Sequence, residues 1–198
     1  VLQEGGVDCS AFLGGIAQNF SSNFVSGKSD WVVVEADEFD RSFLHLDPDI
    51  AVITSIDADH LDIYGDHETM LETGFRAFAK KLKPGGELII QHSLSGYFPG
   101  FEDVQTFGVL GGTYCAENIR VEDGFFVFDY RKEEQTIRNI KFTLPGRHNI
   151  ENATAAITAD PIANPFVTAL VVLPTASRAT MIFCGSPWNS PDISAIPA

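Results

Sequence analysis

The chain has 198 residues, 44% hydrophobic and 20% charged, a composition typical of a folded protein with one core and not of a disordered chain. Its formal net charge of −14 would repel phosphate backbones and anionic membrane surfaces, so nucleic acid is not an expected partner. No run approaches the roughly 18 apolar residues that a membrane span needs. The first residues also lack a signal-peptide pattern, so we expect a soluble cytoplasmic protein without a membrane partner.

The first part of the chain predicts an α/β fold. Residues 31–35 and 50–54 are short β-branched runs, typical of strands buried on both faces of a parallel sheet. Between residues 66 and 83 apolar side chains recur every three or four positions, which predicts a helix that residues 84–86 end. Residues 87–91 predict another strand, completing the strand, helix, strand unit of a doubly wound, mostly parallel sheet.

The pattern changes in the second part of the chain. Alternation over residues 104–144, broken at Gly111-Gly112 and at residues 122–124, predicts a small antiparallel β appendage. An alanine-rich helix is expected over residues 149–159.

The last residues differ in composition from the rest. Residues 161–198 hold six of the ten prolines and show no sustained period. We therefore expect a domain over residues 1–160 and a proline-rich tail, without a functional role, over residues 161–198.

Acidic clusters follow the first two predicted strands directly, at residues 35–40 and 57–62. Neighbouring parallel strands would bring both clusters to the carboxyl edge of the sheet, where ligands bind in open α/β folds. Carboxylates held close together favour a shared cation, and oxygen ligands favour Mg²⁺. Any one of these carboxylates is more often a solvated loop residue, but Glu35, at the tip of an apolar run, favours a functional role. For His60 a structural and a functional role are about equally supported.

The residues around these clusters resemble those of the Mur ligases. The resemblance rests on V-E-A-D-E at 34–38, S-F-L-H-L at 42–46, A-V-I-T-S-I-D-A-D-H-L-D at 51–62 and G-R-H-N-I-E-N-A at 146–153. These motifs occur in order within residues 1–159 and are similar to the central domain of the branch that joins L-alanine to UDP-N-acetylmuramate. A branch that attaches a preformed tripeptide shares the E-A-D-E opening.

The resemblance implies an ATP-dependent ligase of peptidoglycan biosynthesis. In that family the carboxylate of UDP-N-acetylmuramate takes the γ-phosphate of ATP, and the amine of L-alanine then displaces it. The resemblance implies that Glu35 and His60 are catalytic residues that bind Mg²⁺, and that His148, Asn149 and Asn152 hold the adenine of ATP.

The sequence also departs from the family's pattern. No counterpart of the G-T-x-G-K-T phosphate loop, of the UDP-sugar domain or of the amino-acid-binding domain is recognised, so we expect an inactive fragment of the ligase. Ser55 stands where many relatives have Asn, and Lys28 and Arg41 are expected to pair with nearby carboxylates rather than with phosphate. The alternatives are a degenerate module that binds a nucleotide or cation without catalysis, and the tripeptide-adding ligase. An acidic calcium-binding domain is disfavoured because no D-x-D-x-D-G loop is present.

Overall fold

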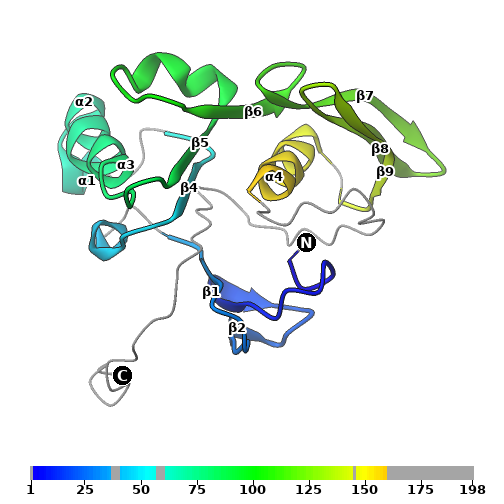
Figure 1. The fold of residues 1–198 in the computed structure, drawn as a ribbon, viewed down its shortest axis with the longest axis horizontal. Coiled ribbons are helices and arrows are strands. Elements are labelled where there is room, and N and C mark those ends of the chain that lie inside the picture. Colours follow the sequence, from blue (N-terminus) through cyan, green and yellow to red (C-terminus); the bar gives the residue numbers. More distant parts are fainter. Residues whose placement is uncertain (1, 37–40, 57–60, 145, 160–198) are drawn as a thin grey trace.

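The computed structural model describes residues 2–36, 41–56, 61–144 and 146–159. Within these residues the strands form a small sheet of order β2-β1-β3 and a larger sheet of order β4-β5-β6-β7-β8-β9, and the small sheet lies below the larger one in Figure 1. In the small sheet β1 is antiparallel to β2 and parallel to β3. Its strands are β1 (Ser10–Ala17), β2 (Ser22–Val25) and β3 (Val32–Val34).

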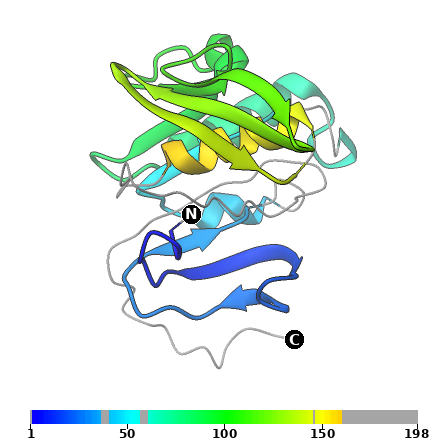
Figure 2. The same ribbon diagram turned by 90° about the vertical axis from the view of Figure 1, so that its right-hand side faces the viewer.

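The larger sheet is parallel from β4 to β7 and antiparallel from β7 to β9. The predicted appendage is therefore a continuation of the main sheet, visible as the long twisted strands of Figure 2. Its strands are β4 (Ile50–Ile53), β5 (Glu87–Gln91), β6 (Gln105–Val109), β7 (Tyr114–Glu122), β8 (Phe125–Lys132) and β9 (Gln135–Phe142).

The break at Gly111-Gly112 does not form the antiparallel hairpin that the sequence predicts. The strands on either side of it, β6 and β7, run parallel, with Phe107 opposite Tyr114. Gly112 has a φ of 100°, and a Cβ atom there would lie 2.9 Å from the carbonyl oxygen of Thr106. This close approach of two backbone segments, which only glycine permits, turns the chain back beside β6.

The helices cover both faces of the parallel part of the larger sheet. The predicted helix over residues 66–83 is confirmed as consecutive helical segments, and the alanine-rich helix is confirmed as α4, which packs against β5, β6 and β7. None of the helices in the described part of the chain is long and apolar enough to cross a membrane. The helical segments are η1 (Ser42–His45), α1 (Leu61–Tyr64), α2 (His67–Met70), η2 (Leu71–Arg76), α3 (Ala77–Ala79), η3 (His92–Tyr97) and α4 (Arg147–Thr158).

Alternating side chains of β4 and β5 fill a core on each face of the sheet. On one face Ala51 and Ile53 pack with Phe43 of η1 and the apolar side of the helix over residues 67–79. On the other face Val52 packs with Ala155 of α4. Because β4 is buried on both sides, it reads as an unbroken apolar run in the sequence.

The sequence predicts that β3 and β4 are hydrogen-bonded neighbours in one sheet, and this prediction is wrong. Strand β3 pairs with β1, whereas β4 pairs with β5 in the other sheet. Residues in and beside β3 nevertheless share the cores of the larger sheet. Val34 and Ala36 pack into the core that contains Ala51, and Trp31 packs into the core that contains Val52. Apolar packing, and not a backbone ladder, therefore relates β3 to the larger sheet.

Candidate functional site

A pocket of about 620 Å³ lies at the carboxyl ends of β4 and β5. This is the edge at which open α/β sheets bind ligands, and the sequence predicts a ligand site there. Loops can vary at this edge without disturbing the buried strands, so polar side chains gather there. The lining residues are Thr54, Ser55, Ile56, His67, Gln91, Ser93, Leu94, Tyr97 and Glu151.

Each side of the pocket comes from a different element. Ser55 lies two residues after β4, Gln91 ends β5, and Tyr97 ends η3. His67 begins α2, whose N-cap Asp66 accepts a hydrogen bond from the amide of Thr69 at 2.7 Å. That bond, which stabilises the charged form, lowers the pKa of Asp66 and fixes where the helix begins.

Hydrogen bonds hold the polar side chains of the pocket in place. Gln91 Nε2 donates to Glu151 Oε1 at 2.9 Å, and Gln91 Oε1 accepts from the amide of Ser93 at 2.7 Å. His67 Nε2 lies 3.2 Å from the carbonyl oxygen of Ile56, and its ring meets the ring of Tyr97 edge-on with centroids 6.0 Å apart. The hydrogen bond between Gln91 and Glu151 therefore connects the carboxyl edge of the sheet to α4 at the pocket.

The three residues expected to hold adenine all lie on the first turns of α4. His148 is exposed, Asn149 is buried and Asn152 is half-buried. None of the three lines the pocket, whereas Glu151 of the same helix does. Gly146, at the N-cap, has a φ of 105°, and a Cβ atom there would lie 2.7 Å from His148 Cε1, so this glycine leaves room for the imidazole.

Glu35 stands just beyond the end of β3 and faces β1. Its Oε2 accepts a hydrogen bond from the amide of Gly14 at 3.0 Å, and its own amide donates to the carbonyl oxygen of Phe12 at 2.8 Å. One carboxylate oxygen is thus oriented by backbone, as a metal-binding carboxylate usually is. His60, its expected partner, lies outside the described residues, and no group of three His, Cys, Asp or Glu side chains suited to a metal is found among the residues that the structure describes.

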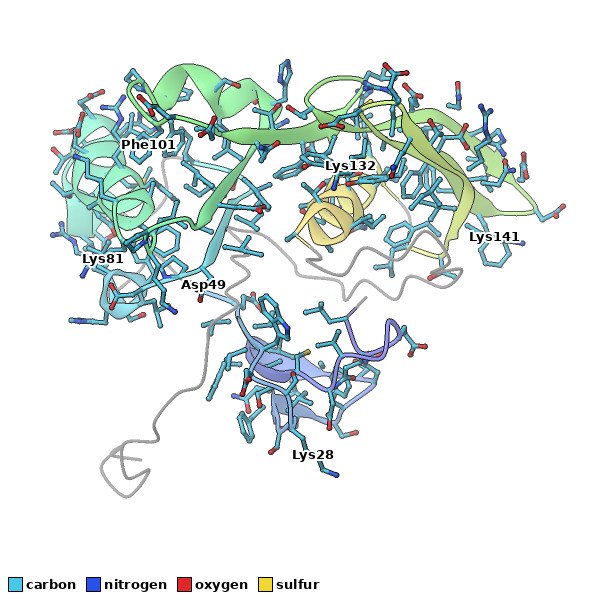
Figure 3. All side chains as sticks on the ribbon, viewed as in Figure 1. Lys28, Asp49, Lys81, Phe101, Lys132 and Lys141 are labelled. Carbon is cyan, nitrogen blue, oxygen red and sulfur yellow. The ribbon has the colours of Figure 1, made fainter. Side chains whose placement is uncertain are left out.

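The two cations nearest the acidic clusters take different positions. Lys28 points away from the larger sheet at the far side of the small one (Figure 3). The guanidinium of Arg41 lies over the ring of Tyr64, 4.6 Å from its centroid, an attractive cation–π geometry. Ser55, which stands where many relatives have Asn, lines the pocket.

Gln91, Ser93 and Glu151 were missed by the sequence reasoning, although a signal for the first two exists. Gln91 ends β5 and Ser93 follows it, much as the acidic clusters lie at the ends of the earlier strands, but amide and hydroxyl groups are less distinctive than a run of carboxylates. Glu151 lies three positions after His148, which places the two on one side of α4.

Comparison with known proteins agrees with this geometry. The Mur ligase middle domain matches residues 16–159, and the chain belongs to the Mur ligase family. It is 48% identical over 159 residues to the UDP-N-acetylmuramate–L-alanine ligase of Christiangramia forsetii, a match that covers 79% of this chain and 33% of the relative. The chain therefore spans about a third of the length of the curated relatives that it matches.

Solved structures show the same fold. A UDP-N-acetylmuramate:L-alanyl-γ-D-glutamyl-meso-diaminopimelate ligase of Neisseria meningitides superposes with a TM-score of 0.73 at 25% identity, covering 89% of this chain and 61% of that one. The UDP-N-acetylmuramate–alanine ligase of Thermotoga maritima superposes with a TM-score of 0.65 at 27% identity, covering 79% and 35%. The predicted membership of the Mur ligase family and the predicted α/β fold class are confirmed.

Proposed function

We propose that this chain is the central nucleotide-binding part of a cytoplasmic, ATP-dependent ligase that joins L-alanine to UDP-N-acetylmuramate in peptidoglycan biosynthesis. The observation that carries the proposal is the pocket at the carboxyl ends of β4 and β5, which Glu151 from the helix of the G-R-H-N motif helps to line. Identities of 40–48% to relatives named as UDP-N-acetylmuramate–L-alanine ligases support alanine as the amine.

In this function the chain's residues position a nucleotide and neutralise charge. Phosphoryl transfer requires the γ-phosphate and the attacking carboxylate to be aligned while cations compensate the developing charge. His148, Asn149 and Asn152 would hold the adenine on the first turns of α4. Ser55, two residues after the end of β4, lines the pocket.

The site chemistry of Glu35 fits Mg²⁺. Its oriented carboxylate offers the hard oxygen that this ion prefers, and His60 is its proposed partner. When bound, Mg²⁺ would neutralise phosphate charge in the transition state. Glu35 would fix the position of the ion because the amide of Gly14 holds its carboxylate in one orientation.

A chimera tests the proposal. Residues 7–159 of this chain would replace the equivalent segment of the Christiangramia forsetii ligase, and phosphate release from ATP would be measured with Mg²⁺ and UDP-N-acetylmuramate. We expect release that depends on L-alanine and falls at least a hundredfold on Glu35→Ala, about the effect of losing one preorganised electrostatic group. Glu134→Gln, in the exposed β8–β9 turn, is the control that removes a carboxylate elsewhere.

A folded chimera without turnover would contradict the proposal and favour the non-catalytic module.

A further inference from the structure

Glu151 carries a carboxylate that faces the pocket and is only partly used by the fold. Its Oε1 accepts the hydrogen bond from Gln91 Nε2, and Gln91 is itself fixed by the amide of Ser93. A carboxylate can accept at both oxygens. The Gln91 contact therefore fixes the orientation of Glu151 and leaves acceptor capacity for a ligand in the pocket.

The lining of the pocket indicates the kind of ligand group that Glu151 would meet. Among the described residues that line it there is no lysine or arginine, and the polar groups besides Glu151 are hydroxyls, an amide and one imidazole. A phosphate placed against Glu151 would be repelled by like charge. A neutral group with hydroxyl donors would be bound well, since a charged acceptor roughly doubles the strength of a hydrogen bond.

The position of Glu151 relates it to one part of a nucleotide. On α4 it lies three positions after His148, so these two side chains share a side of the helix. Through Gln91 it also reaches the end of β5, beside β4 and Ser55. It thus lies between His148, one of the proposed adenine residues, and the carboxyl ends of β4 and β5.

We propose that Glu151, positioned by Gln91, binds the hydroxyl groups of the nucleotide's ribose. The inference rests on the proposed function, because it takes the adenine to lie on α4. Two vicinal hydroxyls donate to one carboxylate, so the site distinguishes a ribonucleoside from its 2′-deoxy form. The same chemical logic operates where an acidic residue holds the ribose in dinucleotide-binding folds.

Nucleoside binding to the chain as printed tests the inference. The probes are adenosine, 2′-deoxyadenosine and 3′-deoxyadenosine, and their dissociation constants are measured by NMR titration. Adenosine should bind about tenfold more tightly than either deoxy form, as expected for one lost charge-assisted hydrogen bond. Glu151→Gln should bring the three constants within about twofold of one another, and Gln91→Ala should reduce the preference in part.

Control variants and outcomes separate the two proposals. Glu134→Gln should keep the preference for adenosine, and thermal unfolding of each variant should verify that it folds. Equal binding of adenosine and its deoxy forms to the unmodified chain would overturn the ribose contact while leaving the nucleotide site in place. No binding of adenosine would overturn the nucleotide site, and the ribose contact with it.

Discussion

Gly14 of β1 lies against the carboxylate of Glu35, so a methyl group added there tests the role of Glu35 without removing its charge. A Cβ atom at Gly14 would lie 3.1 Å from Glu35 Oε1 and 3.3 Å from Cδ, tighter than nine in ten contacts of real Cβ atoms. The carboxylate must give way by a few tenths of an ångström, which loosens the 3.0 Å hydrogen bond from the Gly14 amide. A loss of about 1 kcal/mol, within the range for one hydrogen bond, corresponds to roughly a fivefold change in affinity.

We therefore expect Gly14→Ala in the chimera to raise the Mg²⁺ concentration for half-maximal phosphate release about fivefold. Gly15→Ala is the matched control, since the neighbouring glycine of the same strand has nothing within 4 Å of an added Cβ. It should leave the Mg²⁺ dependence unchanged. Equal effects of the two substitutions would show that any added methyl group in β1 alters the Mg²⁺ dependence, and would refute the role of the Gly14–Glu35 contact.

Three further predictions concern the fold and the chain as printed. Phe43→Ala should lower the free energy of unfolding by about 3–5 kcal/mol in denaturant titrations. Phe43 is fully buried, with its ring centroid 5.3 Å from that of Phe78. An effect below about 1 kcal/mol would contradict this packing. Burial raises the pKa of Asp129, but hydrogen bonds from the amide of Asn139 and from Asn118 Nδ2 outweigh it and hold the pKa below its usual value. Ionised Asp129 should therefore stabilise the fold fully above about pH 4, and this contribution should be lost as the pH falls through the lowered pKa. Asp129→Asn should flatten the acid side of the profile of stability against pH. An unchanged acid side would exclude this role of Asp129. The chain as printed should release no phosphate from ATP, because a site without a recognisable phosphate loop lacks several preorganised donors, each worth about a hundredfold or more; turnover abolished by Glu35→Ala would disprove this.

Much of the fold follows from patterns that are visible in the sequence. The apolar run over Ile50–Ile53 and the periodic positions between Asp66 and Lys83 predict a parallel strand and its crossover helix because their burial is decided by local spacing. The pairing of β3 with β1 could not be predicted in the same way. It depends on which distant strand edge β3 is hydrogen-bonded to, and the residue spacing within β3 does not encode that choice.

Only part of the candidate site could likewise be predicted from the sequence. Charge at the tip of an apolar run points to Glu35, because charge is a local signal, and the resemblance to the Mur ligases points to the first turns of α4. The contact between Gln91 and Glu151 joins residues 60 positions apart, and neither residue type is unusual where it stands. Only the packing of α4 across β5 and β6 reveals that they share a pocket.

The central claim is that a nucleoside binds between α4 and the carboxyl ends of β4 and β5, and backbone amide NMR tests it most directly. Adenosine would be titrated into the uniformly ¹⁵N-labelled chain, and the shift of each amide would be followed. We expect the largest changes at Gln91, Ser93 and residues 147–152, with no change in the β8–β9 turn around Glu134. Saturable changes confined to that turn or to the small sheet, with residues 147–152 unaffected, would contradict it.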